Sequence, residues 1–490
     1  MIPTTCRLAR RIPLSRRSLS SMAHPTTSRE ITPKWLQPIL EDNSEPPRLY
    51  AWTLANLKNV SESGSKGDVK KWVDAEPDVG ADTDPYREKR RIYVLGVGNI
   101  GRLYAACLAK SPKTPPITLV VHRREWLEYW RDKPGIQILG EGWTGELDKR
   151  FDIEWWTDVK PDFGPVKEPG GSPIEESGEC EGESAGIRSL IVATKAADAM
   201  PQVDRLRRYL GPQTEVAFAQ NGMCKLWPPF GEIYARHRWG SADRGPKWRV
   251  CVTKHGVTGL GLFRSLLASP ASVAVGTVGL GVEKGEDTKY LIKQMIMAPG
   301  LAAERVGTRD LWVAQLEKLV VNSIINPLTV VLACKNGEIF NKRGDRVRDV
   351  IDGLLDEASR TLRVLVQDAS TKAILLSAKD VTEVKRSDEV RLNEIRTYLL
   401  KRFTIYKLQP MLYDVGKKVA ENTSSMLQDV RAGKKTEIED INGWLVEMGK
   451  YLDVENSLLA HEKLIALVES VVESKKILSR NELVRHFFGG

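Results

Sequence analysis

The segment "RIYVLGVGNIGRLYAACLAKSPKTPPITLVVHRREW", residues 91–126, decides the fold of the first half of this 490-residue chain. An apolar run leads into the glycines of "GVGNIG", a helical pattern follows them, and prolines precede a second apolar run. This order is typical of a strand, a glycine turn, a helix, a loop and a second strand. The segment therefore predicts a βαβ unit.

The turn contains the pattern G-x-G-x-x-G at Gly96, Gly98 and Gly101. The first glycine permits a tight turn, the second lets a pyrophosphate approach the backbone, and the third allows close helix–strand packing. The helix N-terminus favours an anion. A glycine-rich turn without a ligand is the alternative, but the position between strand and helix favours a dinucleotide site. The predicted cofactor-binding residues of this turn are Gly96, Val97, Gly98, Asn99, Ile100 and Gly101.

The end of the second strand distinguishes between two dinucleotides. NAD sites place an acidic residue there for the ribose 2′-hydroxyl. This chain instead has His122, Arg123 and Arg124 after Val121. Because cations suit a 2′-phosphate, we predict NADPH, with Arg123 as the first candidate ligand and Arg124 as the second. A solvated surface run is the alternative.

The rest of the chain divides by pattern. Strand-like runs recur at "SLIVATK", "EVAFAQNG" and "VAVGTVG". Residues 30–88 are a poorly patterned extension with one helical piece, "LYAWTLANLKN" (49–59), and residues 167–186 resemble a flexible insertion. We predict a Rossmann-type α/β domain over 89–306 and an all-α domain over 307–490.

The net charge of +9 is concentrated at the N-terminus. Residues 1–29 contain six arginines and no acid, which leaves +3 for the remaining residues. The chain as a whole therefore gives no strong case for a nucleic-acid surface. The Arg- and Ser-rich tail predicts a mitochondrial transit peptide and a matrix location. A disordered basic tail is the alternative, and Met22 could serve as a second start.

Two further classes of site are not indicated. No run of about 18 apolar residues is present, so membrane insertion is not predicted. The six cysteines form no C-x-x-C pair, and no His and carboxylate cluster has metal-ligand spacing.

A polar stripe interrupts the apolar segment 316–340. Lys318, Asn322 and Asn326 recur every four residues, so on a helix they fall within a sector of roughly 80°. Burying them costs several kcal/mol unless polar groups meet them. The stripe therefore predicts a polar site on a core helix.

The chain resembles the 2-dehydropantoate 2-reductase (ketopantoate reductase) family over about 91–475. The resemblance is carried in order by "GVGNIG", "IVATKAAD", "AFAQNGM", "KLVVNSIINPLTVVLACKNGEI" and "ENTSSMLQDVRAGKKTEIEDINGWL". It implies NADPH-dependent reduction of 2-dehydropantoate to (R)-pantoate, in pantothenate synthesis. It also implies a helical domain similar to the C-terminal domain of 6-phosphogluconate dehydrogenase, and it allows a homodimer. Reduction of another 2-oxo acid, or a non-catalytic mitochondrial protein on the same fold, are the alternatives.

The resemblance also implies roles at matching positions. Lys318 is the general acid, and Glu437 is a partner of the substrate or of the lysine. Lys195 and Asn221 belong to the cofactor and active site, and the expected substrate-binding residues are Asn322, Asn326, Asn336, Asn422 and Ser425.

Reasoning from the residues agrees with these roles. Desolvation on an apolar helix would lower the pKa of Lys318 toward the range useful for an acid. Thr436 and Glu439 have capping-box spacing, which predicts Glu437 in the first turn of a helix. "TSSMLQDVRAG" predicts a short helix that ends at Gly433.

Four of these positions keep a structural alternative. Lys318 taken alone would be a snorkelling lysine, and Lys195 could be an ordinary surface lysine. Asn336–Gly337 could be a turn, and Ser425 only a helix start.

Overall fold

The computed structural model describes residues 32–58, 87–171, 186–279, 289–340, 346–377, 387–454 and 458–489. The predicted transit peptide (1–29) lies outside the described residues. So does most of the predicted insertion (167–186), since only 167–171 and 186 are described.

A nine-stranded sheet of order β1–β6–β3–β2–β7–β8–β9–β12–β13 forms the first half of the described chain. Neighbours from β6 to β9 run parallel, whereas β1 and β12 lie antiparallel to β6 and β9. The order β6–β3–β2–β7–β8–β9 is that of a Rossmann sheet. From β2, the sheet is extended first on one side by β3 and β6 and then on the other side by β7, β8 and β9. The strands are β1 (Tyr50–Trp52), β2 (Ile92–Leu95), β3 (Ile117–Val121), β6 (Asp152–Thr157), β7 (Ser189–Val192), β8 (Glu215–Phe218), β9 (Lys247–Thr253), β12 (Val273–Thr277) and β13 (Ala303–Arg305).

Both faces of this sheet are covered by helices, which explains why its central strands are mostly apolar. Alternate residues of β8 enter different core clusters: Val216 and Phe218 face one, and Ala217 faces the other. The first cluster also contains residues of α1, α4, α5 and α7, and the second contains residues of α2, α3 and α6. The helices of this half are α1 (Gln37–Glu41), α2 (Asn99–Ala109), α3 (Arg124–Asp132), α4 (Ala196–Arg205), α5 (Phe230–Trp239) and α6 (Tyr290–Met297).

A second, four-stranded sheet has the order β10–β11–β4–β5. Its strands are β4 (Ile136–Gly140), β5 (Leu147–Asp148), β10 (Gly256–Gly261) and β11 (Arg264–Ser269). β10 and β11 form a hairpin.

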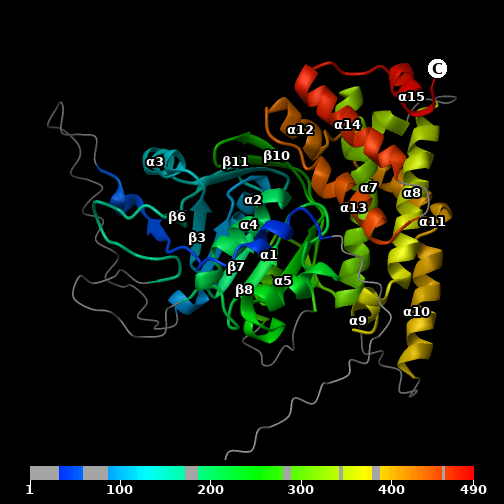
Figure 1. Ribbon diagram of the computed structural model, residues 1–490. Helices are drawn as coiled ribbons and strands as arrows, with labels where there is room; N and C mark the ends of the chain where they lie inside the picture. The colour runs from blue at the N-terminus through cyan, green and yellow to red at the C-terminus, as the bar shows by residue number, and fades with distance from the viewer. Residues whose placement is uncertain are drawn as a thin grey trace, which may run out of the picture. The chain divides into compact units, whose positions relative to one another are not determined.

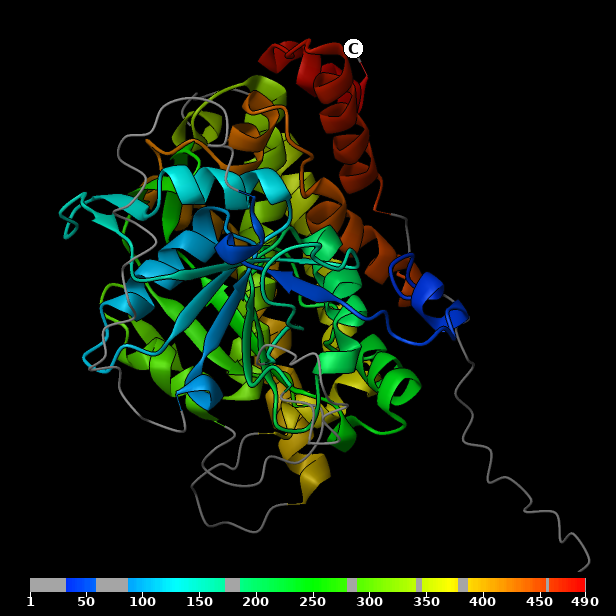
Figure 2. The ribbon, with the colours of Figure 1, turned by 90° about the vertical axis from the view of Figure 1, so that its left-hand side faces the viewer.

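The second half is helical, and its long first helix α7 (Thr308–Leu332) packs against the sheet through Leu311 and Leu316. Figure 1 shows the α/β half and the helical half side by side, and Figure 2 shows the molecule turned by 90° about the vertical axis. The fold class predicted from the sequence is confirmed. The remaining helices are α8 (Val347–Gln367), α9 (Lys372–Leu375), α10 (Asp388–Arg402), α11 (Ile405–Lys418), α12 (Ser425–Arg431), α13 (Trp444–Tyr451), α14 (Leu459–Ser474) and α15 (Arg480–Phe488).

A proline lies inside α7 and is compensated from another helix. Pro327 has no N–H, so the carbonyl of Ser323, four residues earlier, lacks its helical donor. Asn442 Nδ2 donates to this carbonyl at 2.8 Å. This hydrogen bond from Asn442 thus stabilises α7 close to its polar stripe.

The helical prediction for residues 49–59 is wrong. Tyr50–Trp52 form β1, which pairs with β6, and Leu54–Asn56 form a short 3-10 helix. Aromatic residues favour strands, and the open edge of β6 provides the pairing that a local helical pattern cannot anticipate.

Candidate active site

The glycine turn after β2 fits a dinucleotide. Gly96 has φ +94°, and a Cβ there would lie 2.8 Å from the backbone nitrogen of Thr194. A Cβ on Gly101 would lie 2.0 Å from the carbonyl oxygen of Gly96, so helix and turn pack closely. Gly98 is exposed, and a Cβ there would meet nothing within 4 Å. Open space next to bare backbone at a helix N-terminus is what a pyrophosphate requires.

The two arginines after β3 differ in their surroundings. Arg124 Nε lies 3.0 Å from Glu128 Oε1, and its guanidinium lies 5.3 Å from the ring centroid of Trp52. Arg123 is exposed, precedes α3, and forms no ion pair within the described ranges. Of these two arginines, Arg123 is therefore the less engaged by other side chains in the described part.

Lys318 lies where α7 crosses the carboxyl ends of two strands. Its Nζ donates to the carbonyl oxygen of Thr253 at 2.6 Å and to Asn221 Oδ1 at 3.0 Å. Thr253 ends β9, and Asn221 follows β8. Burial lowers the pKa of Lys318 to about 8, the charge of Glu437 opposes this shift, and the charge of Lys254 adds to it.

The carboxylate of Glu437 joins the same group. Glu437 Oε2 accepts a hydrogen bond from Asn221 Nδ2 at 3.2 Å, and Oε1 accepts one from the backbone N–H of Ala196 at 3.4 Å. Lys195 Nζ lies 3.7 Å from Oε2. Ala196 is the first residue of α4, so this carboxylate occupies the N-terminus of α4, where the helix dipole favours it.

The predicted capping box at Thr436 and Glu439 is wrong. The helical segment starts with a π-helical stretch, Glu439–Gly443, whose N-cap residue is Ile438 and has no side-chain cap. Glu437 precedes this stretch. The N-terminus of α4, which is remote in the sequence, stabilises its charge.

Asp429 is a site residue that the sequence reasoning missed. Its Oδ2 accepts a hydrogen bond from Lys195 Nζ at 2.5 Å. Burial raises the pKa of Asp429, and Lys195 opposes this shift. Burial alone would lower the pKa of Lys195, but Glu437 and Asp429 outweigh it and raise that pKa. Asp429 lies one turn after Ser425 on α12, a spacing that could have drawn attention to it.

A second polar group joins the hairpin to the helical half. Asn422 Nδ2 donates to Ser269 Oγ at 2.9 Å, and the backbone carbonyl of Asn422 accepts from the backbone N–H of Asn336 at 3.0 Å. Asn336 is buried at the start of a 3-10 helix, and its side-chain oxygen has no partner within the described part. Ser269 was not anticipated from the sequence.

The remaining predicted substrate residues, Asn322, Asn326 and Ser425, are not hydrogen-bonded to Lys318 through their side chains in the described part of the chain. Asn326 is buried and Asn322 is partly buried on α7. Ser425 is the first residue of α12, and the cap is Ser424, whose Oγ accepts from Leu427 N. The predicted end of α12 at Gly433 agrees with its φ of +64°.

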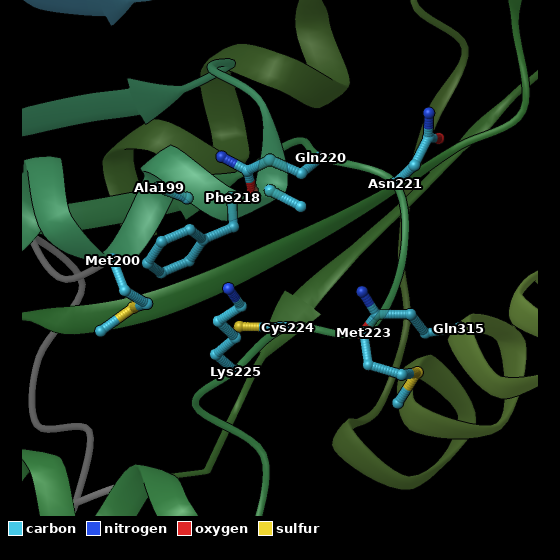
Figure 3. Close-up of a pocket in the computed structure, with 10 residues that line it drawn as sticks. Ala199, Met200, Phe218, Gln220, Asn221, Met223, Cys224, Lys225 and Gln315 are labelled. Carbon is cyan, nitrogen blue, oxygen red and sulfur yellow. The ribbon is translucent and has the colours of Figure 1, made fainter. Parts of the chain in front are cut away.

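A small pocket adjoins this site from the side of α4. Figure 3 shows Asn221 at the edge of this pocket, with its amide directed away from Phe218 and Met200. Asn221 and Ala196, which both bond to Glu437, line this pocket, whereas Lys318 and Glu437 do not. The pocket is therefore a neighbour of the site rather than its centre.

No group of His, Cys, Asp and Glu in the described residues could hold a metal ion, and no helix there is long and apolar enough to cross a membrane.

Comparison with known proteins identifies the family. Residues 92–283 match the family "Ketopantoate reductase PanE/ApbA", and residues 310–471 match "Ketopantoate reductase PanE/ApbA C terminal". These two regions cover more than half of the chain. The chain belongs to the ketopantoate reductase family. As a ketopantoate reductase family member it is an oxidoreductase, with the glycine turn and Asn221 in the first matched region and Lys318 and Glu437 in the second.

Relatives within the ketopantoate reductase family differ in their substrates. The ketoisovalerate reductase of Beauveria bassiana is 37% identical over 475 residues, which cover 92% of this chain and 98% of that protein. The 2-dehydropantoate 2-reductase of Salmonella typhimurium is 26% identical over 324 residues, 64% of this chain and 87% of that protein. The crystal structure of a ketopantoate reductase from Ralstonia eutropha shares the fold, with a TM-score of 0.51 and 15% identity over 79% of this chain and 99% of that one.

Proposed function

We propose that this protein reduces a short branched 2-oxo acid and uses NADPH as the hydride donor. The observation that carries the proposal is the partly buried Lys318 ammonium, whose pKa desolvation lowers to about 8, at the carboxyl ends of β8 and β9. The glycine turn lies at the same edge of the sheet, after β2. Reduction of a carbonyl requires a hydride donor and a proton donor at one place, and this edge would bring them together.

Each residue has a physical part in this reaction. Lys318 would donate its proton to the oxygen of the 2-oxo group as negative charge develops there. Thr253 and Asn221 hold the ammonium by its other N–H groups, and Glu437 orients Asn221. The dinucleotide, held by the turn Gly96–Gly101, would supply the hydride to the 2-oxo carbon.

Two observations support ketoisovalerate over 2-dehydropantoate as the substrate. A 37% identical relative over nearly the whole chain is a ketoisovalerate reductase. 2-Dehydropantoate also carries a hydroxyl that ketoisovalerate lacks. Glu437, which the family resemblance makes a partner of the substrate or of Lys318, already accepts hydrogen bonds from Ala196 and Asn221, which leaves fewer of its lone pairs for that hydroxyl.

The test is NADPH oxidation by the purified chain with ketoisovalerate, 2-dehydropantoate and pyruvate. We expect kcat/KM to be about tenfold or more higher for ketoisovalerate than for 2-dehydropantoate. A tenfold preference in the opposite direction would make 2-dehydropantoate the substrate. Absence of turnover with every 2-oxo acid would favour a non-catalytic protein on this fold.

Cofactor preference is expected to depend on Arg123. Arg123→Ala should weaken NADPH binding by about 10–100-fold, because a charge-assisted hydrogen bond contributes about 1.5–3 kcal/mol. NADH, which lacks the 2′-phosphate, should bind the variant and the original chain equally. Arg124→Ala is the matched control, since Glu128 and Trp52 already engage that side chain. Isothermal titration with both nucleotides measures this, and equal NADPH and NADH affinities in the original chain would refute it.

A mitochondrial matrix location remains part of the proposal, and it is supported by the composition of residues 1–29. N-terminal sequencing of the protein from its native cells should find removal of roughly the first twenty residues. An intact Met1 with no shorter form would contradict it.

A further inference from the structure

Arg102 is a buried cation that bonds to no carboxylate among the described residues. It lies in the first turn of α2, directly after the glycine turn, and is 6% exposed. No acidic side chain in the described ranges forms an ion pair with it. Burial lowers the pKa of Arg102 to about 10.

Within the described part of the chain, its guanidinium bonds to neutral oxygens. Nε donates to the carbonyl of Gly98 at 3.1 Å, and Nη2 donates to Asn99 Oδ1 at 2.7 Å. Nη1 donates to the carbonyls of Gly261 and Arg264, at 2.6 and 2.8 Å. Arg102 therefore ties the turn between β10 and β11 to the glycine turn.

This placement is unfavourable for the protein alone. The N-terminus of a helix already carries partial positive charge, and a buried cation in its first turn adds charge of the same sign. A buried charge without a counter-charge also loses its hydration. Residues that break local rules in this way tend to mark functional positions, and an anion is the kind of group that would compensate this charge.

The nearby backbone offers a place for that anion. Gly98 is exposed, and a Cβ on it would meet nothing within 4 Å. Its carbonyl oxygen accepts the hydrogen bond from Arg102 Nε. Asn99 Oδ1 accepts from Arg102 and also from Ser265 Oγ at 3.3 Å, which fixes the first residue of α2. An anion at Gly98 would meet the helix N-terminus and the field of Arg102 together.

We propose that Arg102 is a positioning residue that supplies the buried counter-charge for the diphosphate of the cofactor. It acts through the Gly98–Asn99 turn that it holds, and it serves NADPH and NADH equally because both carry the diphosphate. This inference rests on the proposed dinucleotide function but does not depend on the identity of the 2-oxo acid.

Binding measurements on substituted proteins test it. Arg102→Met should raise the dissociation constants for NADPH and NADH by a similar factor, about 5- to 50-fold. Adenosine 2′-phosphate, which has no diphosphate, should bind with unchanged affinity. Arg102→Lys retains the charge and should recover most of the NADPH affinity. The matched control is Arg264→Met, because the Arg264 side chain is exposed on the same hairpin and bonds to Gln137.

The outcomes separate the explanations. Unchanged NADPH affinity in Arg102→Met would overturn the proposal, and so would an equal loss for adenosine 2′-phosphate, which would indicate a structural role alone. If Arg102→Met fails to fold, the lysine variant decides. An NADPH affinity of Arg102→Lys that is about tenfold or more below that of the original chain would overturn the role of charge. Failure of the original chain to bind either dinucleotide would overturn this inference and the proposed function together. Binding without turnover of any 2-oxo acid would overturn only the proposed activity.

Discussion

Replacement of Lys318 by alanine is expected to lower kcat for 2-oxo acid reduction by about 10²–10⁴-fold, the usual contribution of a general acid. Lys318 is the ammonium that Thr253 and Asn221 hold at the carboxyl edge of the sheet. The affinity for NADPH should change little, because the nucleotide is expected to bind mainly at the glycine turn. Steady-state kinetics with fluorescence titration of NADPH measures both quantities.

Arginine at this position provides the sharper control. Lys318→Arg retains the positive charge, but a guanidinium does not release its proton in a protein. The variant should therefore lose most of the rate. If it turns over at the original rate, Lys318 is an electrostatic anchor, and Lys195 becomes the next candidate for the acid.

The second large effect concerns Glu437. Glu437→Gln should lower kcat/KM by about 10–100-fold, because it weakens charge-assisted hydrogen bonds worth about 1.5–3 kcal/mol to the groups around Lys318. It should also change the pH dependence. Only the protonated form of Lys318 can donate, so kcat/KM should be constant at low pH and fall above a pH of about 8.

The direction of the pH shift follows from the charges. Glu437 raises the pKa of Lys318, so Glu437→Gln should move the falling limb to lower pH. Lys254 is exposed and lowers the same pKa, so Lys254→Gln should move the limb to higher pH. Measurement of kcat/KM from pH 6 to 10 for the matched pair tests this. If the pH profiles of kcat/KM for both variants fall at the same pH as that of the original chain, Lys318 is not the titrating acid.

Local patterns in the sequence were sufficient for much of the fold. A strand, a glycine turn and a helix follow one another within 91–109, and the positions of Gly96 and Gly101 are required by steric contacts within that turn. The four-residue spacing of the polar stripe likewise placed Lys318 on a helix that is apolar elsewhere. These features depend on near neighbours in the chain, so periodicity reveals them.

The errors have a common cause. Tyr50–Trp52 became a strand because β6 offered an open edge, and Glu437 obtained its stabilising helix N-terminus from α4 rather than from its own segment. In both cases the deciding partner lies more than 100 residues away in the sequence. A local pattern contains no information about such a partner.

The sequence by itself determined that this protein has a dinucleotide-type turn, a helix with a polar stripe and membership of an oxidoreductase family. Only the tertiary structure decided what meets Lys318: the backbone carbonyl of Thr253, which has no signature in side-chain type, and the amide of Asn221. It also decided that Asp429 engages Lys195 and that Arg102 is buried with no ion pair to any described residue. The physical reason is that desolvation and hydrogen bonding depend on which distant groups meet, and packing of the two halves determines those meetings.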